Sequence, residues 1–362
     1  SRKLAMVRLI GAIALSVAVF SPAVQAQDIS LSEQINQVFS GTQTINQTMA
    51  TSGDDLLLNS GGNTPLASLT PLADNTPKLS QSGGNTANTI NQPDVSIFSA
   101  GQSLLGQQGT TNSVELWQDS VLHDINQQGI NIANAITAQA LNSVTQLLDD
   151  SAVQKVDNST TTGSAIGDLT QTGVNAANLA FVTESIGSGS QKFPQGAVQE
   201  INNNVALQNG ASANSIQQTG VNIGNLLSAD RVDQVTRVFA GTQKITNNVN
   251  FGSSQMPASI TQGGVNVANL VVASQIGELH QISTGTQTTT NTVEDGTLQQ
   301  YTDNPFGGVL TQQSNENYVN IVVLKGATQD GQNIVLSQQA DFPQTNTGAP
   351  ASQVGNTMSI NE

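Results

Sequence analysis

Apolar and polar residues alternate with a period of two through much of the chain, and glycine and asparagine interrupt the alternation at regular intervals. In residues 262–269, one parity carries glutamine, glycine, asparagine and alanine, whereas the other carries two valines and then Asn269. This alternation, together with the β-branched residues, favours β-strands. The small and amide side chains suit a tight interior, and the apolar parity predicts strands that are covered on both faces.

One short phrase, a glutamine followed four residues later by an asparagine, recurs along these predicted strands. Successive asparagines of a first set lie 44 to 47 residues apart, and a second set falls between them. The first set pairs Gln81 with Asn85, Gln127 with Asn131, Gln171 with Asn175, Gln218 with Asn222 and Gln262 with Asn266. The second set pairs Gln108 with Asn112, Gln154 with Asn158, Gln199 with Asn203, Gln243 with Asn247 and Gln287 with Asn291. A fixed period indicates stacked copies of one unit, so we predict an all-β fold, a β-solenoid of stacked double repeats of about 45 residues.

A mixed array of strands and helices is the alternative fold. After Asn131, apolar residues recur at the three-and-four spacing of a helix face, at Ala133, Ile136, Ala140, Leu141, Val144 and Leu148. After Asn266 the equivalent text becomes a Leu-Val-Val run, and after Asn222 two aspartates interrupt the pattern. These differences between repeats favour strands for the array as a whole.

Buried asparagine and glutamine side chains need partners for both the carbonyl and the NH2 group, because an unpaired buried amide is costly. Stacking identical amides removes that cost, since each amide donates to the copy on one side and accepts from the copy on the other. Such a ladder also fixes the register, because a slip breaks every bond in the column. We therefore predict that the glutamines and asparagines of both sets are ladder and assembly residues.

Composition divides the chain into segments. A basic start, an apolar core and a small-residue cleavage site are typical of a secretory signal peptide. No later stretch reaches the roughly 18 apolar residues that span a bilayer, so we expect an exported chain without a transmembrane anchor. The predicted segments are the signal peptide at 1–26, a degenerate N-terminal half-repeat at 27–49, a Gly/Pro/Ser-rich loop or linker at 50–78, the repeat array at 79–325 and a polar C-terminal tail or cap at 326–362.

The charge balance limits the possible partners. The formal net charge of -15 at pH 7 disfavours binding to nucleic acid or to an anionic membrane. Cysteine is absent, so an exported chain of this length has to fold without disulfides. Catalytic groups are scarce, with His123 and His280 as the two histidines and ten lysines and arginines in total. We expect no enzyme activity, cofactor or metal, and keep a polysaccharide-processing β-helix enzyme as a third alternative.

The repeat phrases resemble those of curlins, the secreted subunits of bacterial functional-amyloid fibres. Gln171-Thr-Gly173-Val-Asn175-Ala-Ala177 keeps the curlin order of glutamine, glycine, asparagine and alanine, with the asparagine one residue nearer to the glutamine. The double repeat is also similar to fimbrial amyloid subunits of the pseudomonad type, although this chain lacks their terminal Cys-x-x-Cys. The resemblance covers residues 79–325 and implies outer-membrane export and nucleation machinery as partners, and a location outside the cell or at a bacterial surface.

These observations predict a secreted structural subunit that self-associates into adhesive surface or biofilm-matrix fibres, a functional amyloid. Unpaired backbone groups and open ladder positions at the end of a stack are templates for another copy of the chain. The alternative is a non-polymerising surface adhesin, in which the β-solenoid is a rigid stalk and the loops bind a ligand.

Overall fold

The structure is a computed structural model that describes residues 34–52, 55–62, 66–71, 77–117, 122–252, 254, 257–294, 310–325, 335–340, 344–347 and 351–361. The predicted signal peptide lies outside these residues. Every regular element in the described part of the chain is a β-strand, so the predicted all-β class is confirmed and the helical alternative is wrong. No helix long and apolar enough to cross a membrane occurs in these ranges.

The strands form two sheets with parallel pairing throughout, apart from two antiparallel strands at one end. The 13-stranded sheet contains β1 (Gln34–Phe39), β4 (Leu66–Pro71), β5 (Pro77–Leu104), β7 (Asp124–Leu148), β9 (Ile166–Val182), β10 (Ser185–Phe193), β12 (Ala213–Ser228), β13 (Arg231–Phe239), β15 (Ser259–Ala273), β16 (Gln275–Ser283), β18 (Leu310–Lys325), β19 (Val335–Ala340) and β21 (Ala351–Asn361). The 8-stranded sheet contains β2 (Thr42–Ser52), β3 (Asp55–Gly62), β6 (Gln107–Leu116), β8 (Val153–Thr162), β11 (Val198–Leu207), β14 (Thr242–Asn250), β17 (Thr286–Glu294) and β20 (Gln344–Thr347).

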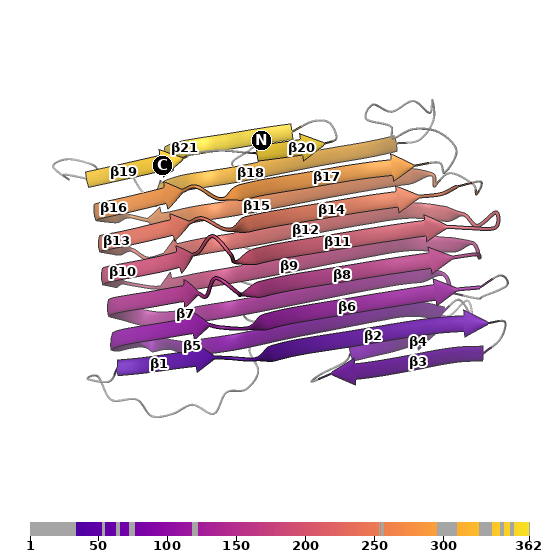
Figure 1. The fold of residues 1–362 in the computed structure, drawn as a ribbon, viewed down its shortest axis with the longest axis horizontal. Coiled ribbons are helices and arrows are strands. Elements are labelled where there is room, and N and C mark those ends of the chain that lie inside the picture. The colour runs from indigo at the N-terminus through magenta and orange to yellow at the C-terminus, as the bar shows by residue number, and fades with distance from the viewer. Residues whose placement is uncertain are drawn as a thin grey trace.

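The chain passes through three columns of strands in each repeat, and we call one such pass a layer. The first column holds β4, the first halves of β5 and β7, and then β9, β12, β15, β18 and β21. The second column holds β1, the second halves of β5 and β7, and then β10, β13, β16 and β19. The third column is the 8-stranded sheet. Figure 1 shows the resulting stack, with β1 and β2 at one end and β19, β20 and β21 at the other.

Parallel pairing places like residues opposite one another in successive layers. Asn175 of β9 lies opposite Asn131 of β7 on one side and opposite Asn222 of β12 on the other. Gln171 lies in the same way between Gln127 and Gln218. One sequence period therefore equals one layer, so a pattern in the sequence becomes a column in space.

The helix-like spacing after Asn131 arises from an irregularity in the strand that shifts which residues point inward. The pairing of β7 with β9 runs in register but skips Ala133. On the two sides of this irregularity, Asn131 Nδ2 donates to the carbonyl of Lys155 in the third column, and Asn134 Nδ2 donates to the carbonyl of Leu147 in the second. Both asparagines therefore point inward although they are three residues apart.

Within each layer, apolar side chains fill the corners where two columns meet, and amide side chains lie between these corners. One apolar cluster, which includes Ile136 and Leu141, lies where the first column meets the second. Another, which includes Leu116 and Leu169, lies where the third column meets the first. On the opposite parity of the first column, Ile132 and its register partners in the following layers are buried as well. Side chains are therefore buried on both faces of the first column.

Strands also occur in the segments that flank the array. Residues 50–78, predicted as a loop or linker, contain the end of β2 and the strands β3 and β4, which pair antiparallel with β2 and β5. Residues 326–362, predicted as a polar tail or cap, contain β19, β20 and β21, which extend the second, third and first columns in parallel. The stack therefore has antiparallel strands at its N-terminal end and parallel strands at its C-terminal end.

Candidate functional site: buried amide ladders

The first set of glutamines and asparagines forms two hydrogen-bonded ladders inside the first column. Each glutamine Nε2 donates to Oε1 in the preceding layer over 2.8–2.9 Å, in the order Gln262, Gln218, Gln171, Gln127 and Gln81. Each asparagine Nδ2 donates to Oδ1 in the following layer over 2.9–3.1 Å, in the order Asn85, Asn131, Asn175, Asn222, Asn266 and Asn317. The two ladders run in opposite directions, so their amide dipoles partly cancel.

The second set forms the corresponding pair of ladders inside the third column. Its glutamines donate to the preceding layer over 2.8–2.9 Å, in the order Gln287, Gln243, Gln199, Gln154, Gln108 and Gln43. Its asparagines donate to the following layer over 2.8 Å, in the order Asn112, Asn158, Asn203, Asn247 and Asn291. All the residues of both predicted sets are at most 5% exposed.

The second proton of most of these amides donates to a backbone carbonyl on the opposite side of the interior. Gln127 Nε2 donates to the carbonyl of Ser159 at 3.0 Å, and Asn131 Nδ2 donates to the carbonyl of Lys155 at 2.9 Å. In the opposite sense, Gln154 of the third column donates to the carbonyl of Ala176 at 2.9 Å. Because the ladder and cross-interior bonds together use both protons, the cost of burying the NH2 group is largely offset.

Two further ladders were missed in the sequence-based prediction. One starts from the second asparagine of an Asn-x-x-Asn pattern and joins Asn88, Asn134, Asn178, Asn225, Asn269 and Asn320 over 2.8 Å. The other lies in the second column and joins Gln191, Gln146, Gln102 and Gln37 over 2.7–2.9 Å. Both ladders leave a signal in the sequence. The asparagine ladder was missed because residues three apart do not lie on one face of a regular strand. The glutamine ladder was missed because its spacing to the third-column ladder varies, as the offsets Gln102 to Gln108 and Gln146 to Gln154 show.

Arg237 interrupts the second-column ladder. It occupies the register position between Gln191 and Gln281, and its Nε donates to Gln191 Oε1 at 2.8 Å. The side chain is fully buried, and Nη1 and Nη2 have no hydrogen-bond partner. Burial holds the pKa of this guanidinium well below its usual value, since the charged form loses its hydration. This layer therefore carries the free-energy cost of buried donors without partners, which the layers with glutamine at the same position avoid.

A row of glycines lets the first and third columns approach each other. Gly129, Gly173 and Gly220 lie in the first column between the ladder glutamines and asparagines. A Cβ at Gly173 would lie 2.4 Å from Cγ2 of Ile201, and one at Gly129 would lie 2.5 Å from Cγ1 of Val156. The glycines of the phrase are therefore required by aliphatic side chains that enter from the opposite column.

The ladders end differently at the N-terminal end. Gln47 lies opposite Asn112, where the third-column ladder would carry another asparagine. It donates to the carbonyl of Ser82, so Oε1 of Gln47 and Oδ1 of Asn112 are left without partners. In the first column, β4 pairs with β5 without placing an amide opposite Gln81, whose partner is Ala67.

The ladder register continues at the C-terminal end. Asn356 lies opposite Asn320, Gln338 lies opposite Gln281, and Gln344 lies opposite Gln287. Gln353 lies opposite Asn317, so one of the asparagine ladders meets a glutamine there. Three of the four positions thus repeat the residue of the preceding layer.

Apart from the buried Arg237, several charged groups near the surface form local pairs. Burial by itself would raise the pKa of Asp124, but hydrogen bonds from Lys78, the backbone of Asp168 and His123 outweigh it and lower the pKa to about 2. The other histidine, His280, contacts Glu278 at 2.7 Å. No group of three or more histidine, aspartate or glutamate residues that could hold a metal ion occurs in the part of the chain that the structure describes.

Comparisons with known proteins add no relative to this picture. No family model matches the chain, and no curated protein or solved structure matches it either.

Proposed function

We propose that this chain is a secreted structural subunit, a β-solenoid that polymerises end to end into adhesive surface or biofilm-matrix fibres. The observation that carries the proposal is the unbroken course of the first- and third-column ladders through layers paired in parallel and in register. Since every layer binds its neighbours through the same groups, a layer from a second copy can bind through them too.

The C-terminal end supports this function. There β19, β20 and β21 are the last strands of their columns, and their register continues three of the ladders. The partner is another copy of the same chain. By its resemblance to curlins, we extend the proposal to export from a bacterial cell through an outer-membrane pore with its nucleation machinery.

The antiparallel strands at the N-terminal end favour the second candidate, a non-polymerising surface adhesin. Because β3 pairs antiparallel with β2, and β4 with β5, the parallel ladder does not continue past them in two of the three columns. A finite stack of this kind would act as a rigid stalk. The two functions differ in whether the purified chain grows into fibres.

Assembly of residues 27–362 after dilution from denaturant tests the proposal. We expect thioflavin fluorescence to rise after a lag, fibres to appear by negative-stain microscopy, and preformed fragments to remove the lag. Fibre diffraction should show a reflection near 4.7 Å, the spacing of stacked strands. A chain that stays a β-rich monomer at every concentration would instead support the adhesin.

A ladder variant distinguishes assembly directed by the amide ladders from non-specific aggregation. Asn158→Ala removes an inward amide of β8, whereas Lys155→Ala changes a half-exposed side chain of the same strand. We expect Asn158→Ala to slow growth on wild-type seeds and Lys155→Ala to leave it unchanged. Equal rates for the two variants would show that the amide ladder does not direct assembly.

A further inference from the structure

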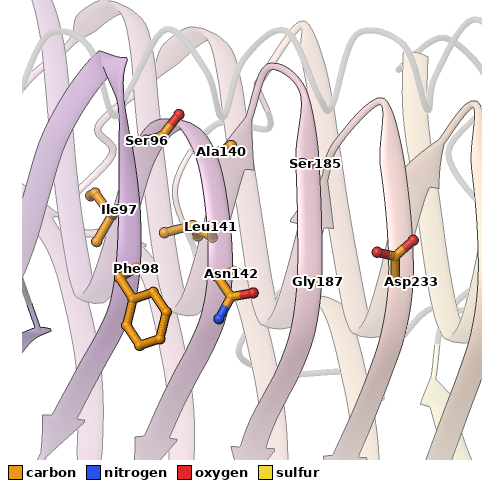
Figure 2. Close-up of a pocket in the computed structure, with 9 residues that line it drawn as sticks. All are labelled: Ser96, Ile97, Phe98, Ala140, Leu141, Asn142, Ser185, Gly187 and Asp233. Atoms are coloured by element: carbon orange, nitrogen blue, oxygen red, sulfur yellow. The ribbon is translucent and has the colours of Figure 1, made fainter. Parts of the chain in front are cut away.

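A groove crosses four neighbouring strands of the second column on the outer surface of the stack. It has a volume of about 330 Å³ and is lined by residues of β5, β7, β10 and β13. These strands are aligned, with Ile97 opposite Leu141 and Leu141 opposite Ile186. Figure 2 shows the groove with Phe98 and Asn142 on adjacent strands and Asp233 further along the stack.

The groove carries an exposed aromatic ring. Ile97 and Leu141 belong to the interior cluster and are 3% and 1% exposed, whereas the ring of Phe98 beside Ile97 is 50% exposed. A half-exposed phenylalanine on a chain with 3% aromatic residues leaves a large apolar surface in water. Such a ring offers a flat face to a ligand that has an apolar face of its own.

Polar groups lie beyond the ring. Asn142 is exposed on β7, Gly187 follows on β10, and Asp233 follows on β13. Gly187 leaves room for the Asn142 side chain, whose Oδ1 would lie 3.3 Å from a Cβ at that position. With strands about 4.8 Å apart, the backbones of Asn142 and Asp233 are separated by roughly 10 Å. The amide can donate and accept, and the carboxylate can accept, so they suit a ligand with hydroxyl groups along its length.

The charges of the groove exclude ionic ligands. None of the lining residues is basic, and the chain carries a net charge of -15, so an anionic ligand is repelled. Asp233 Oδ1 already accepts from Arg231 Nε at 2.5 Å, so a cationic ligand gains little there. The ligand that fits is neutral.

A peptide is a poor fit to the same groove. Peptides that bind sheets usually add a strand to an unpaired edge, where the backbone supplies most of the affinity. Here β7 lies between β5 and β10, and β10 lies between β7 and β13, so the groove does not lie at an open sheet edge, although the register skips its outward residues. Recognition has to come from side chains, which suits a ligand with one apolar face and many hydroxyl groups.

We propose that this groove binds a neutral polysaccharide, with Phe98 stacking against the face of one sugar ring and Asn142 and Asp233 bonding to hydroxyl groups further along the chain. The groove extends along the stack axis over three strand spacings, roughly 14 Å, which accommodates a short run of sugar rings. The proposal does not depend on polymerisation, because all the lining residues belong to one copy.

Calorimetric titration of the full-length monomer with cellohexaose and chitohexaose, two neutral hexasaccharides, tests the site. We expect binding of at least one of them, weakened by about tenfold or more in Phe98→Ala because the stacking face is lost. Asn142→Ala should weaken binding several-fold. Asp233→Asn should change it by less than about twofold, because the amide still accepts a hydrogen bond.

Trp117→Ala is the matched control, since this tryptophan is 53% exposed and directly follows β6 of the other sheet. Its affinity should equal that of the wild type, and Phe98→Trp, which keeps an aromatic face, should bind at least as well. Absence of binding to both sugars, an equal loss in Trp117→Ala, or tighter binding of the anionic oligogalacturonate would overturn the proposal. So would loss of binding in Phe98→Trp with an unchanged circular dichroism spectrum.

Discussion

At the residue scale, the interior depends on amides that have a partner in both neighbouring layers. Asn131 accepts from Asn85, donates to Asn175 and also donates to the carbonyl of Lys155. A single substitution therefore affects three layers at once. The loss of one partner is costly because the amides that remain stay buried without their bonds.

Asn131→Ala is expected to reduce the free energy of unfolding by roughly 1–3 kcal/mol, because it leaves Asn85 Nδ2 and Asn175 Oδ1 without their ladder partner. Asn126→Ala, at an exposed position of the same strand, should cost less than about 0.5 kcal/mol. The urea midpoints of the two variants measure the difference. Equal midpoints would mean that the ladder contributes nothing to stability.

Arg237→Gln is expected to stabilise the fold. The substitution restores the glutamine found at Gln191 and Gln281 and removes two buried donors that lack partners. Since an unsatisfied buried donor costs roughly 1–3 kcal/mol, the midpoint of thermal or urea unfolding should rise.

Arg231→Gln is the control for the Arg237 variant. Arg231 is exposed and its ion pair with Asp233 lies at the surface, where such pairs contribute about 0–1 kcal/mol. Its substitution should leave the unfolding midpoint close to that of the wild type. A fall in stability in Arg237→Gln would show that the guanidinium has a stabilising role in the interior.

At the element scale, the distance between columns is set by glycine on one side and branched side chains on the other. Val156, Ile201 and Ile245 form a buried cluster of the third column. A Cβ at Gly173 or Gly220 would lie within 2.5 Å of Ile201 or Ile245, respectively. The first-column strand can carry its two ladders close to the third column only because these glycines leave room.

Gly173→Ala should therefore destabilise the fold by roughly 1–3 kcal/mol, the usual cost of overpacking a tight core. Gly109→Ala is the matched control, because its Cβ would have Thr44 Cγ2 at 4.0 Å as its nearest neighbour. Chemical denaturation of both variants is the measurement. In the Gly173→Ala background, Ile201→Ala should lower the free energy of unfolding by less than it does in the wild type. If the two losses simply add, the contact between the two sites is contradicted.

At the scale of the whole molecule, the two ends of the stack are unlike. Antiparallel strands cover two of the three columns at the N-terminal end, whereas parallel strands form the C-terminal end. Antiparallel strands interrupt the parallel register, so the two ends offer different templates to a second copy. Growth of a fibre should therefore respond to changes at the N-terminal strands.

Replacing residues 53–76 with the five-residue connector 208–212, which joins β11 to β12, removes β3 and β4 and uncovers two columns. In the proposed fibre subunit, the lag of thioflavin fluorescence should shorten, because the antiparallel strands no longer cover the end. A control that replaces residues 63–65 with Gly-Ser-Gly keeps both strands and should keep the wild-type lag. An unchanged or longer lag in the connector variant would show that β3 and β4 are not caps.

The sequence by itself determined the all-β class, the repeat and the membership of four ladders. It could do so because parallel stacking turns a period in the chain into a column in space, so Gln171 or Asn175 meets its own copies in the layers beside it. The two-residue alternation was enough to place the amides of the first set on one face of their strands and the neighbouring valines and isoleucines of the first column on the other.

Only the tertiary structure decided how the columns face one another. The inward position of Asn134 depends on the irregularity at Ala133, and the unpaired guanidinium of Arg237 depends on which layer it enters. Likewise, the need for Gly173 comes from Ile201, which lies in another column. The physical reason is that the corners between columns vary in length, so contacts across the interior are set by the packed layers and not by any spacing within one strand.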